Sequence, residues 1–85
     1  MTTLHVGPTS LFHSIAAAMV AAVDNDIIQL DHGYSNETAT VTHASMTFDG
    51  DATSTGIVLQ LGVGITGFTT LGAAVFEIRG AINAN

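Results

Sequence analysis

The chain has 85 residues, of which 9% are charged, and a single Lys or Arg stands against seven carboxylates, giving a formal net charge of −6. A chain of this length forms at most one small domain. Its acidic balance repels phosphate backbones and anionic lipid surfaces, so we expect neither a nucleic acid nor a membrane as its partner. The absence of cysteine excludes disulfides and thiolate metal ligands.

The N-terminal part predicts a short strand followed by one amphipathic helix. Residues 4–6 have strand character and end at a Gly-Pro turn signal. Apolar residues then recur at helical spacing over residues 10–23, with Ser10 or Ser14 as the N-cap. We expect this helix to stop at residues 24–26, whose Asp and Asn side chains favour turns. The expected core of the helical cap consists of Leu11, Phe12, Ile15 and Met19.

The rest of the chain predicts short strands that each end at a glycine-containing turn. Apolar and polar residues alternate within them, as where Gln29 lies between Ile28 and Leu30, so one face of each strand is buried and the other is solvated. Residues 52–76 carry no charge, but their glycines and threonines favour strands over a membrane-spanning helix. The strand-like segments are residues 27–30, 46–48, 57–61, 67–71 and 75–78.

These segments repeat at intervals of about twenty residues. Residues 46–50 align with residues 68–72, and residues 58–61 align with residues 75–78, which lie 17 positions further on. Short strands that repeat at this distance are typical of a solenoid. We therefore predict an all-β solenoid, a parallel β-helix of about two to three coils, capped by one N-terminal α-helix. The single module spans residues 1–85, with the strand and capping helix in residues 4–26 and the coils in residues 27–85.

Several motifs resemble, in sequence and in order along the chain, the start of the pectate-lyase-like right-handed β-helices. They are His5-Val6-Gly7-Pro8, Phe12-His13-Ser14-Ile15, Asn25-Asp26-Ile27-Ile28, Gly33-Tyr34 and, on a later rung, Gly67-Phe68-Thr69. Asn25 stands where that family prefers glycine, which an Asn in the left-handed conformation can replace. The chain is most similar in character to N-terminal modules of secreted bacterial proteins of the calcium-binding repeat type. The resemblance implies a right-handed β-helix and an extracellular or cell-surface location, although residues 1–20 show no signal-peptide pattern.

No residue pattern points to catalysis or to a bound metal or cofactor. Residues 24–26 and 49–51 offer oxygens to calcium, but neither fits a calcium-loop pattern, and a helix stop and a coil corner explain them. Glu77 and Arg79 share one strand face and are expected to form a surface ion pair. We therefore expect a protein that is not an enzyme and holds no metal or cofactor. Metal-ligand spacing is missing among the four histidines, which are His5, His13, His32 and His43.

The last coil is expected to expose backbone groups and core residues, because no capping pattern follows it. Either further coils or a second copy of the chain can cover this end, and we expect a homo-oligomer. The expected function is that of a structural, self-assembling module with at most weak carbohydrate contact. The alternative is the front part of a polysaccharide lyase or glycoside hydrolase whose active site lies on missing coils. The expected assembly edge consists of Val75, Phe76, Ile78 and Ile82.

Overall fold

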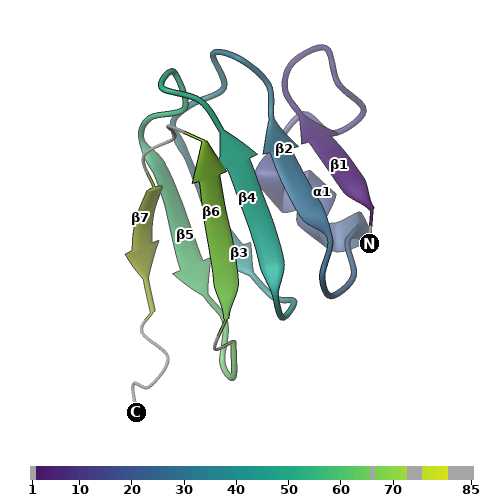
Figure 1. Ribbon diagram of the computed structural model, residues 1–85, viewed down its shortest axis with the longest axis vertical. Coiled ribbons are helices and arrows are strands. Elements are labelled where there is room, and N and C mark those ends of the chain that lie inside the picture. Colours follow the sequence, from purple (N-terminus) through teal and green to yellow (C-terminus); the bar gives the residue numbers. More distant parts are fainter. Residues whose placement is uncertain (1, 66, 73–75, 81–85) are drawn as a thin grey trace.

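The computed structural model describes residues 2–65, 67–72 and 76–80. Within them the chain forms a parallel β-solenoid of about four turns with one short helix (Figure 1). This confirms the predicted fold class, with more turns than we expected. The elements are β1 (Thr3–Val6), α1 (Ile15–Ala21), β2 (Ile27–Leu30), β3 (Glu37–Val41), β4 (Met46–Gly50), β5 (Ile57–Leu61), β6 (Phe68–Gly72) and β7 (Phe76–Arg79).

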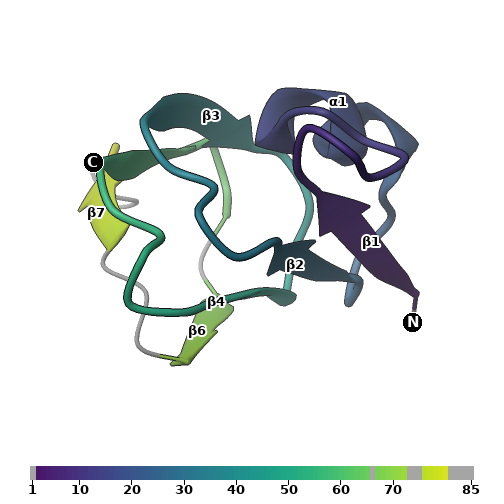
Figure 2. The same ribbon diagram turned by 90° about the horizontal axis from the view of Figure 1, so that it is seen from above.

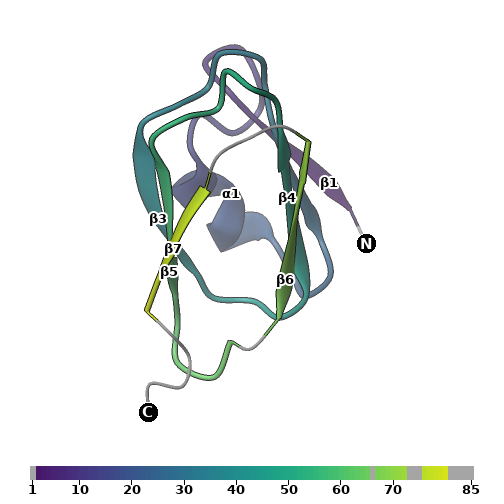
Figure 3. The same ribbon diagram turned by 60° about the vertical axis from the view of Figure 1, so that its left-hand side comes forward.

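Two parallel sheets face each other across the core. One contains its strands in the order β1-β2-β4-β6 and the other in the order β3-β5-β7. From β2 onward the chain alternates between the sheets, so each turn adds one strand to each of them (Figure 2). In the first turn α1 takes the place of a strand. The helix contacts both β1 and β3 and covers the N-terminal end of the core (Figure 3).

The core consists of alternate strand residues that point inward between the sheets. Ile28 and Phe48 are neighbours in the ladder between β2 and β4, and Leu59 comes from the second sheet. All three side chains are 0% exposed. Burying one side chain of this kind stabilises a fold by about 1.5–3 kcal/mol. In a chain without disulfides, this regular stack is therefore the main source of stability.

The helix is shorter than the sequence predicted and begins at Ile15. Its N-cap is Ser14, not Ser10: the Ser14 backbone is extended (φ −152°), and its side chain accepts a hydrogen bond from Ala17 N at 3.0 Å. An extended residue at position 14 separates the helix from the apolar residues before it, so the helical spacing there does not continue into a helix. Within the described residues, no helix is long and apolar enough to cross a membrane.

The residues expected to form the core of the helical cap separate into two groups. Ile15 and Met19 are buried, and Phe12 packs partly against the core cluster. Leu11 is 85% exposed, so its assignment to the core was wrong. It lies in a loop that is closed by a hydrogen bond from Gly7 N to Phe12 O at 2.9 Å, and this loop directs the Leu11 side chain into solvent.

The predicted register is confirmed in one sheet and wrong in the other. β4 pairs with β6 so that Met46 lies beside Phe68, as the alignment of residues 46–50 with 68–72 predicted. β5 pairs with β7 so that Ile57 lies beside Phe76, a separation of 19 residues instead of the predicted 17. A shift of two residues keeps the same side chains on the inward face, because side chains alternate along a strand.

β3 was absent from the predicted strands. Its sequence, Glu-Thr-Ala-Thr-Val, lacks the alternation of large apolar residues that marks the other strands. Small side chains suit its place next to α1, where Ala39 is buried. β3 completes the second turn of the solenoid, and its omission is one reason why the predicted number of coils was too low.

The turn between α1 and β2 depends on a left-handed residue. Asn25 has a φ of 73°, as its place in the motif predicted. Its N–H donates a hydrogen bond to Ala44 O at 3.0 Å, which belongs to the next turn of the solenoid. Asn tolerates this conformation better than most residues, so the corner keeps a side chain where glycine is the usual choice.

Candidate functional site

The C-terminal end of the solenoid exposes inward-facing side chains. Phe76 and Ile78 of β7 lie beside Ile57 and Leu59 of β5. Ile57 and Leu59 are 1% and 0% exposed, whereas Ile78 is 40% exposed and Phe76 is half-buried. The difference arises because β5 has a strand on both sides, while β7 is the last described strand of its sheet. We call the surface formed by Phe68, Phe76 and Ile78 the end face.

Three phenylalanines connect the end face with the core. Phe48 is fully buried, and its ring centroid lies 6.5 Å from that of Phe68 and 6.3 Å from that of Phe76. Both pairs are edge-to-face, an arrangement that adds about 0.5–1.5 kcal/mol beyond the area it buries. Phe68 belongs to one sheet and Phe76 to the other. The cluster therefore holds the two halves of the end face against the same core residue.

The predicted assembly edge lies partly within the described chain. Phe76 and Ile78 belong to the end face, whereas Val75 and Ile82 lie outside the described residues. Phe68 was not among the predicted edge residues. Its alignment with the core residue Met46 was the sequence signal for its inward position, because residues paired in a parallel ladder point to the same side.

An ion pair borders the end face on the outer side of β7. Arg79 Nε donates a hydrogen bond to Glu77 Oε2 at 2.5 Å, as their positions on one strand face predicted. This bond raises the pKa of Arg79 above its ordinary value. The two side chains are 56% and 57% exposed, so water screens the pair and it adds little to stability. Its effect is to place a polar pair at the rim of an apolar surface.

The acidic cluster after α1 holds the backbone at the end of the helix. Asp26 is buried, and its carboxylate accepts hydrogen bonds from Thr2 N at 2.8 Å and from Val23 N at 3.0 Å. The bond from Val23 lowers the pKa of Asp26 below its ordinary value, although burial acts in the opposite direction. Asp24 accepts a hydrogen bond from Ala44 N at 3.0 Å. These carboxylates thus bind backbone N–H groups at the end of the helix and in the next turn.

A second polar cluster lies at a corner where two turns meet. Asp51 accepts a hydrogen bond from Thr53 N at 2.8 Å, and its carboxylate lies 2.8 Å from His32 Nδ1. Hydrogen bonds from the Thr53 hydroxyl and from His32 lower the pKa of Asp51 to about 2. Thr53 also accepts a hydrogen bond from Gly33 N at 2.6 Å. The cluster therefore links adjacent turns and leaves His32 81% exposed.

The histidines and carboxylates of the described residues occur in pairs and not in larger clusters. Among residues 2–65, 67–72 and 76–80, no three His, Asp or Glu side chains are close enough together to hold a metal ion. His32 contacts Asp51, and His43 lies 3.6 Å from Asp24, so each of these histidines has one acidic neighbour. A single His-Asp contact orients an imidazole but provides neither a nucleophile nor a ligand set.

A scan against protein-family models found no match, and searches of curated proteins and of solved structures found none either.

Proposed function

We propose that this chain is a non-catalytic structural module whose end face pairs with the end face of a second copy. The observation that carries the proposal is a contrast within one ladder: Leu59 is 0% exposed, and Ile78 beside it is 40% exposed. Removing apolar surface from water is favourable by about 25 cal/mol for each Å². The strand edges of β6 and β7 add backbone groups that favour pairing with another strand.

The size of the end face supports this pairing. The molecule measures 37 Å along its longest axis and 18 Å along its shortest, and the longest axis follows the strands (Figure 1). An end perpendicular to the solenoid axis therefore covers at most roughly 670 Å², and two such ends bury at most roughly 1,300 Å² in total. That area is within the range of specific protein–protein interfaces. A two-fold axis makes the contact self-complementary and covers both ends at once.

Charge opposes the pairing and provides a control. Each copy carries a formal charge of −6, so two copies repel each other at long range. Salt screens this repulsion over a Debye length of about 10 Å at 0.1 M ionic strength. Dimerisation through an apolar face is therefore expected to strengthen as salt is added, whereas pairing through ion pairs would weaken.

The same proposal includes a pectate-lyase-like, right-handed coil and a secreted or cell-surface location. It is supported by the order of the motifs that begin with Gly7-Pro8 and by the left-handed Asn25 at the position where that family has glycine. In a longer protein of this kind, further coils would cover the side chains that the second copy covers in the proposed dimer. Either arrangement would bury the same exposed residues, Phe76 and Ile78.

Light scattering over a dilution series tests the pairing. We expect the unmodified chain to be a dimer at about 100 μM and to dissociate at lower concentration, as an interface of moderate affinity does. Ile78→Glu places a charge on the end face and is expected to give a monomer at every concentration. Leu11→Glu is the matched control, because Leu11 is 85% exposed and lies at the other end of the solenoid.

Circular dichroism establishes that both variants remain folded before their masses are compared. A monomeric mass for the unmodified chain at about 100 μM contradicts the proposal. So does a dimer that Ile78→Glu leaves intact or that Leu11→Glu dissociates equally well.

A further inference from the structure

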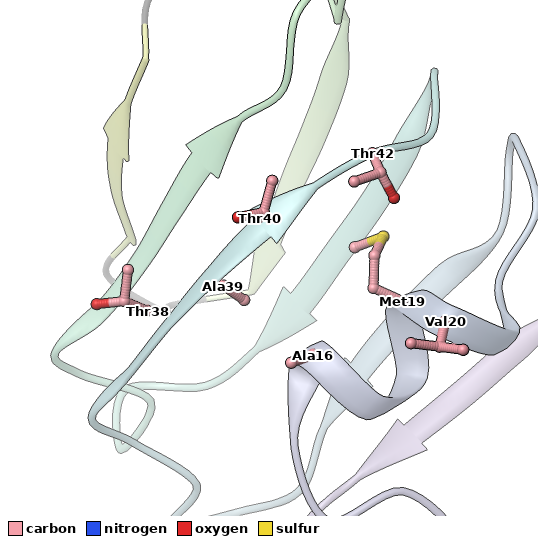
Figure 4. A pocket seen from close by; sticks show the side chains of 7 residues that line it. All are labelled: Ala16, Met19, Val20, Thr38, Ala39, Thr40 and Thr42. Carbon is pink, nitrogen blue, oxygen red and sulfur yellow. The ribbon is translucent and has the colours of Figure 1, made fainter.

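A groove lies between the helix and the first strand of the second sheet, near the N-terminal end of the solenoid. It has a volume of about 320 Å³, at the lower end of the range for ligand pockets. Figure 4 shows that one wall comes from α1 and the other from β3 and the residue after it. The strands that carry the end face, β6 and β7, lie at the other end of the solenoid from α1 (Figure 2). The lining residues are Ala16, Met19, Val20, Thr38, Ala39, Thr40 and Thr42.

The strand wall of the groove presents backbone donors and acceptors. β3 is the first strand in the order β3-β5-β7, so only one of its edges pairs with a strand. Val41 O accepts a hydrogen bond from Gly62 N at 2.9 Å, which shows that the polar backbone groups of Val41 point toward β5. Successive residues of a parallel strand point these groups in opposite directions. The N–H and C=O groups of Thr38 and Thr40 therefore point toward α1.

These backbone groups remain available for a partner. Within the part of the chain that the structure describes, no backbone hydrogen bond joins Thr38 or Thr40 to α1. Both residues are exposed, whereas their ladder partners Val58 and Gln60 on the next turn are half-buried. An edge with free N–H and C=O groups is a template for an added strand.

The helix wall of the groove is apolar and consists of short side chains together with Met19. Val20 is 88% exposed, and Ala16 carries only a methyl group, so a chain can approach β3 closely along this side. Met19 lines the groove with a flexible thioether that adapts to different side chains. An unpaired strand edge facing an apolar wall matches how extended peptides are bound: the backbone pairs with the strand, and alternate side chains fill the groove.

The charges near the groove determine which peptides fit. Asp24, whose side chain is 62% exposed, lies beside His43 just beyond the far end of β3. The chain as a whole has a formal charge of −6, so it repels acidic segments. We propose that this groove binds an extended basic peptide segment of a partner protein as an added strand beside β3.

A capped peptide of sequence Lys-Val-Thr-Val-Thr-Lys is the probe, titrated into the 15N-labelled full chain. We expect saturable shifts of the amide signals of Thr38 and Thr40. Two further peptides carry N-methyl groups on alternate residues, one set starting at the first Val and the other at the first Thr. Only one set places its methyl groups against β3, so one peptide is expected to bind at least about tenfold more weakly than the other.

Two matched variants locate the site on the protein. Val20→Arg fills the groove with a bulky cation and is expected to weaken binding about tenfold or more. Val63→Arg makes the same change at a valine that is 106% exposed in the turn after β5, and it is expected to change the affinity less than twofold. Thr40→Pro removes an N–H that points into the groove and spares the bonds to β5, so it should also weaken binding.

The proposal is overturned if the probe shows no saturable binding up to about 1 mM. Equal binding of the two methylated peptides overturns it as well, and so does unchanged binding by Val20→Arg. Shifts confined to β1, or to β6 and β7, place the peptide on another strand edge and likewise contradict it. Because the groove and the end face are at opposite ends of the solenoid, Ile78→Glu is expected to leave peptide binding unchanged.

Discussion

Glu37 closes the N-terminus of a helix that precedes it in sequence: its Oε1 accepts a hydrogen bond from Ile15 N at 2.7 Å, and its Oε2 accepts one from Ala16 N at 3.1 Å. The next two N–H groups of the helix bond to Ser14, one to its side chain and one to its carbonyl. The N–H groups of Ile15, Ala16 and Ala17, which have no partner within the helix, therefore all have acceptors. Glu37 occupies an inward position of β3, in register with the buried Ile57, so one carboxylate couples the cap to the coils.

Glu37→Ala is expected to destabilise the fold by about 2 kcal/mol, because it leaves two helix N–H groups without their charged acceptor. Urea unfolding followed by circular dichroism measures the change. Glu77→Ala is the control, since Glu77 is exposed and takes part in a screened surface pair worth less than about 1 kcal/mol. Equal effects of the two substitutions would show that the hydrogen bonds to α1 do not stabilise the cap.

Tyr34 predicts a loss of stability at alkaline pH. Burial, together with the hydrogen bond that its hydroxyl donates to Glu37, raises the pKa of Tyr34 from 10.0 to about 12. A raised pKa means that the protonated phenol stabilises the folded state. This contribution is complete below pH 10, the value in the unfolded chain, and is lost as the pH rises toward 12.

The chain contains one tyrosine, so phenolate absorbance reports this group alone. We expect a titration midpoint near 12 in the folded protein and near 10 in urea. Tyr34→Phe is expected to flatten the dependence of unfolding free energy on pH between these values. A folded midpoint near 10 would contradict the contact with Glu37.

The core stack and the loop before the helix are expected to respond very differently to truncation. Phe48→Ala removes the ring that contacts both phenylalanines of the end face and is expected to cost about 3–5 kcal/mol. Leu11→Ala is expected to change the stability by less than about 0.5 kcal/mol, because Leu11 is 85% exposed. Thermal and urea unfolding measure both. A large loss of stability in Leu11→Ala would show that Leu11 packs in the core of the cap after all.

The two sheets show where sequence repeats predict register and where they do not. The pairing of β4 with β6 was predictable because residues 46–50 and 68–72 both end in glycine at a turn, which anchors the alignment. The predicted register of β5 with β7 was wrong by two residues, because the apolar Val58 was aligned with the apolar Val75. In the structure Val58 lies beside Glu77 on the outer face of the sheet. Neighbouring residues on a solvated face need not be alike in polarity, so the apolar match misled the alignment.

Two of the three end-face residues were likewise predicted from the sequence. Phe76 and Ile78 follow the alternation of an inward face, and both were predicted as residues of the assembly edge. The cap by Glu37 had no comparable signal. A carboxylate in a short strand of small residues is typical of a solvated edge. The helix N–H that the Glu37 carboxylate binds belongs to Ile15, which lies 22 residues earlier in the sequence.

By itself the sequence determined the solenoid, because alternating apolar residues, glycine turns and a repeat of about twenty residues depend only on local geometry and spacing. It also placed Asn25 in the left-handed conformation. Only the tertiary structure decided that Leu11 faces solvent, that Glu37 caps α1, and that a groove opens beside β3. The exposure of Leu11 depends on the loop that Gly7 and Phe12 close, and the cap and the groove depend on which element lies next to a given strand or helix. That neighbour comes from another turn of the chain, so no local pattern specifies it.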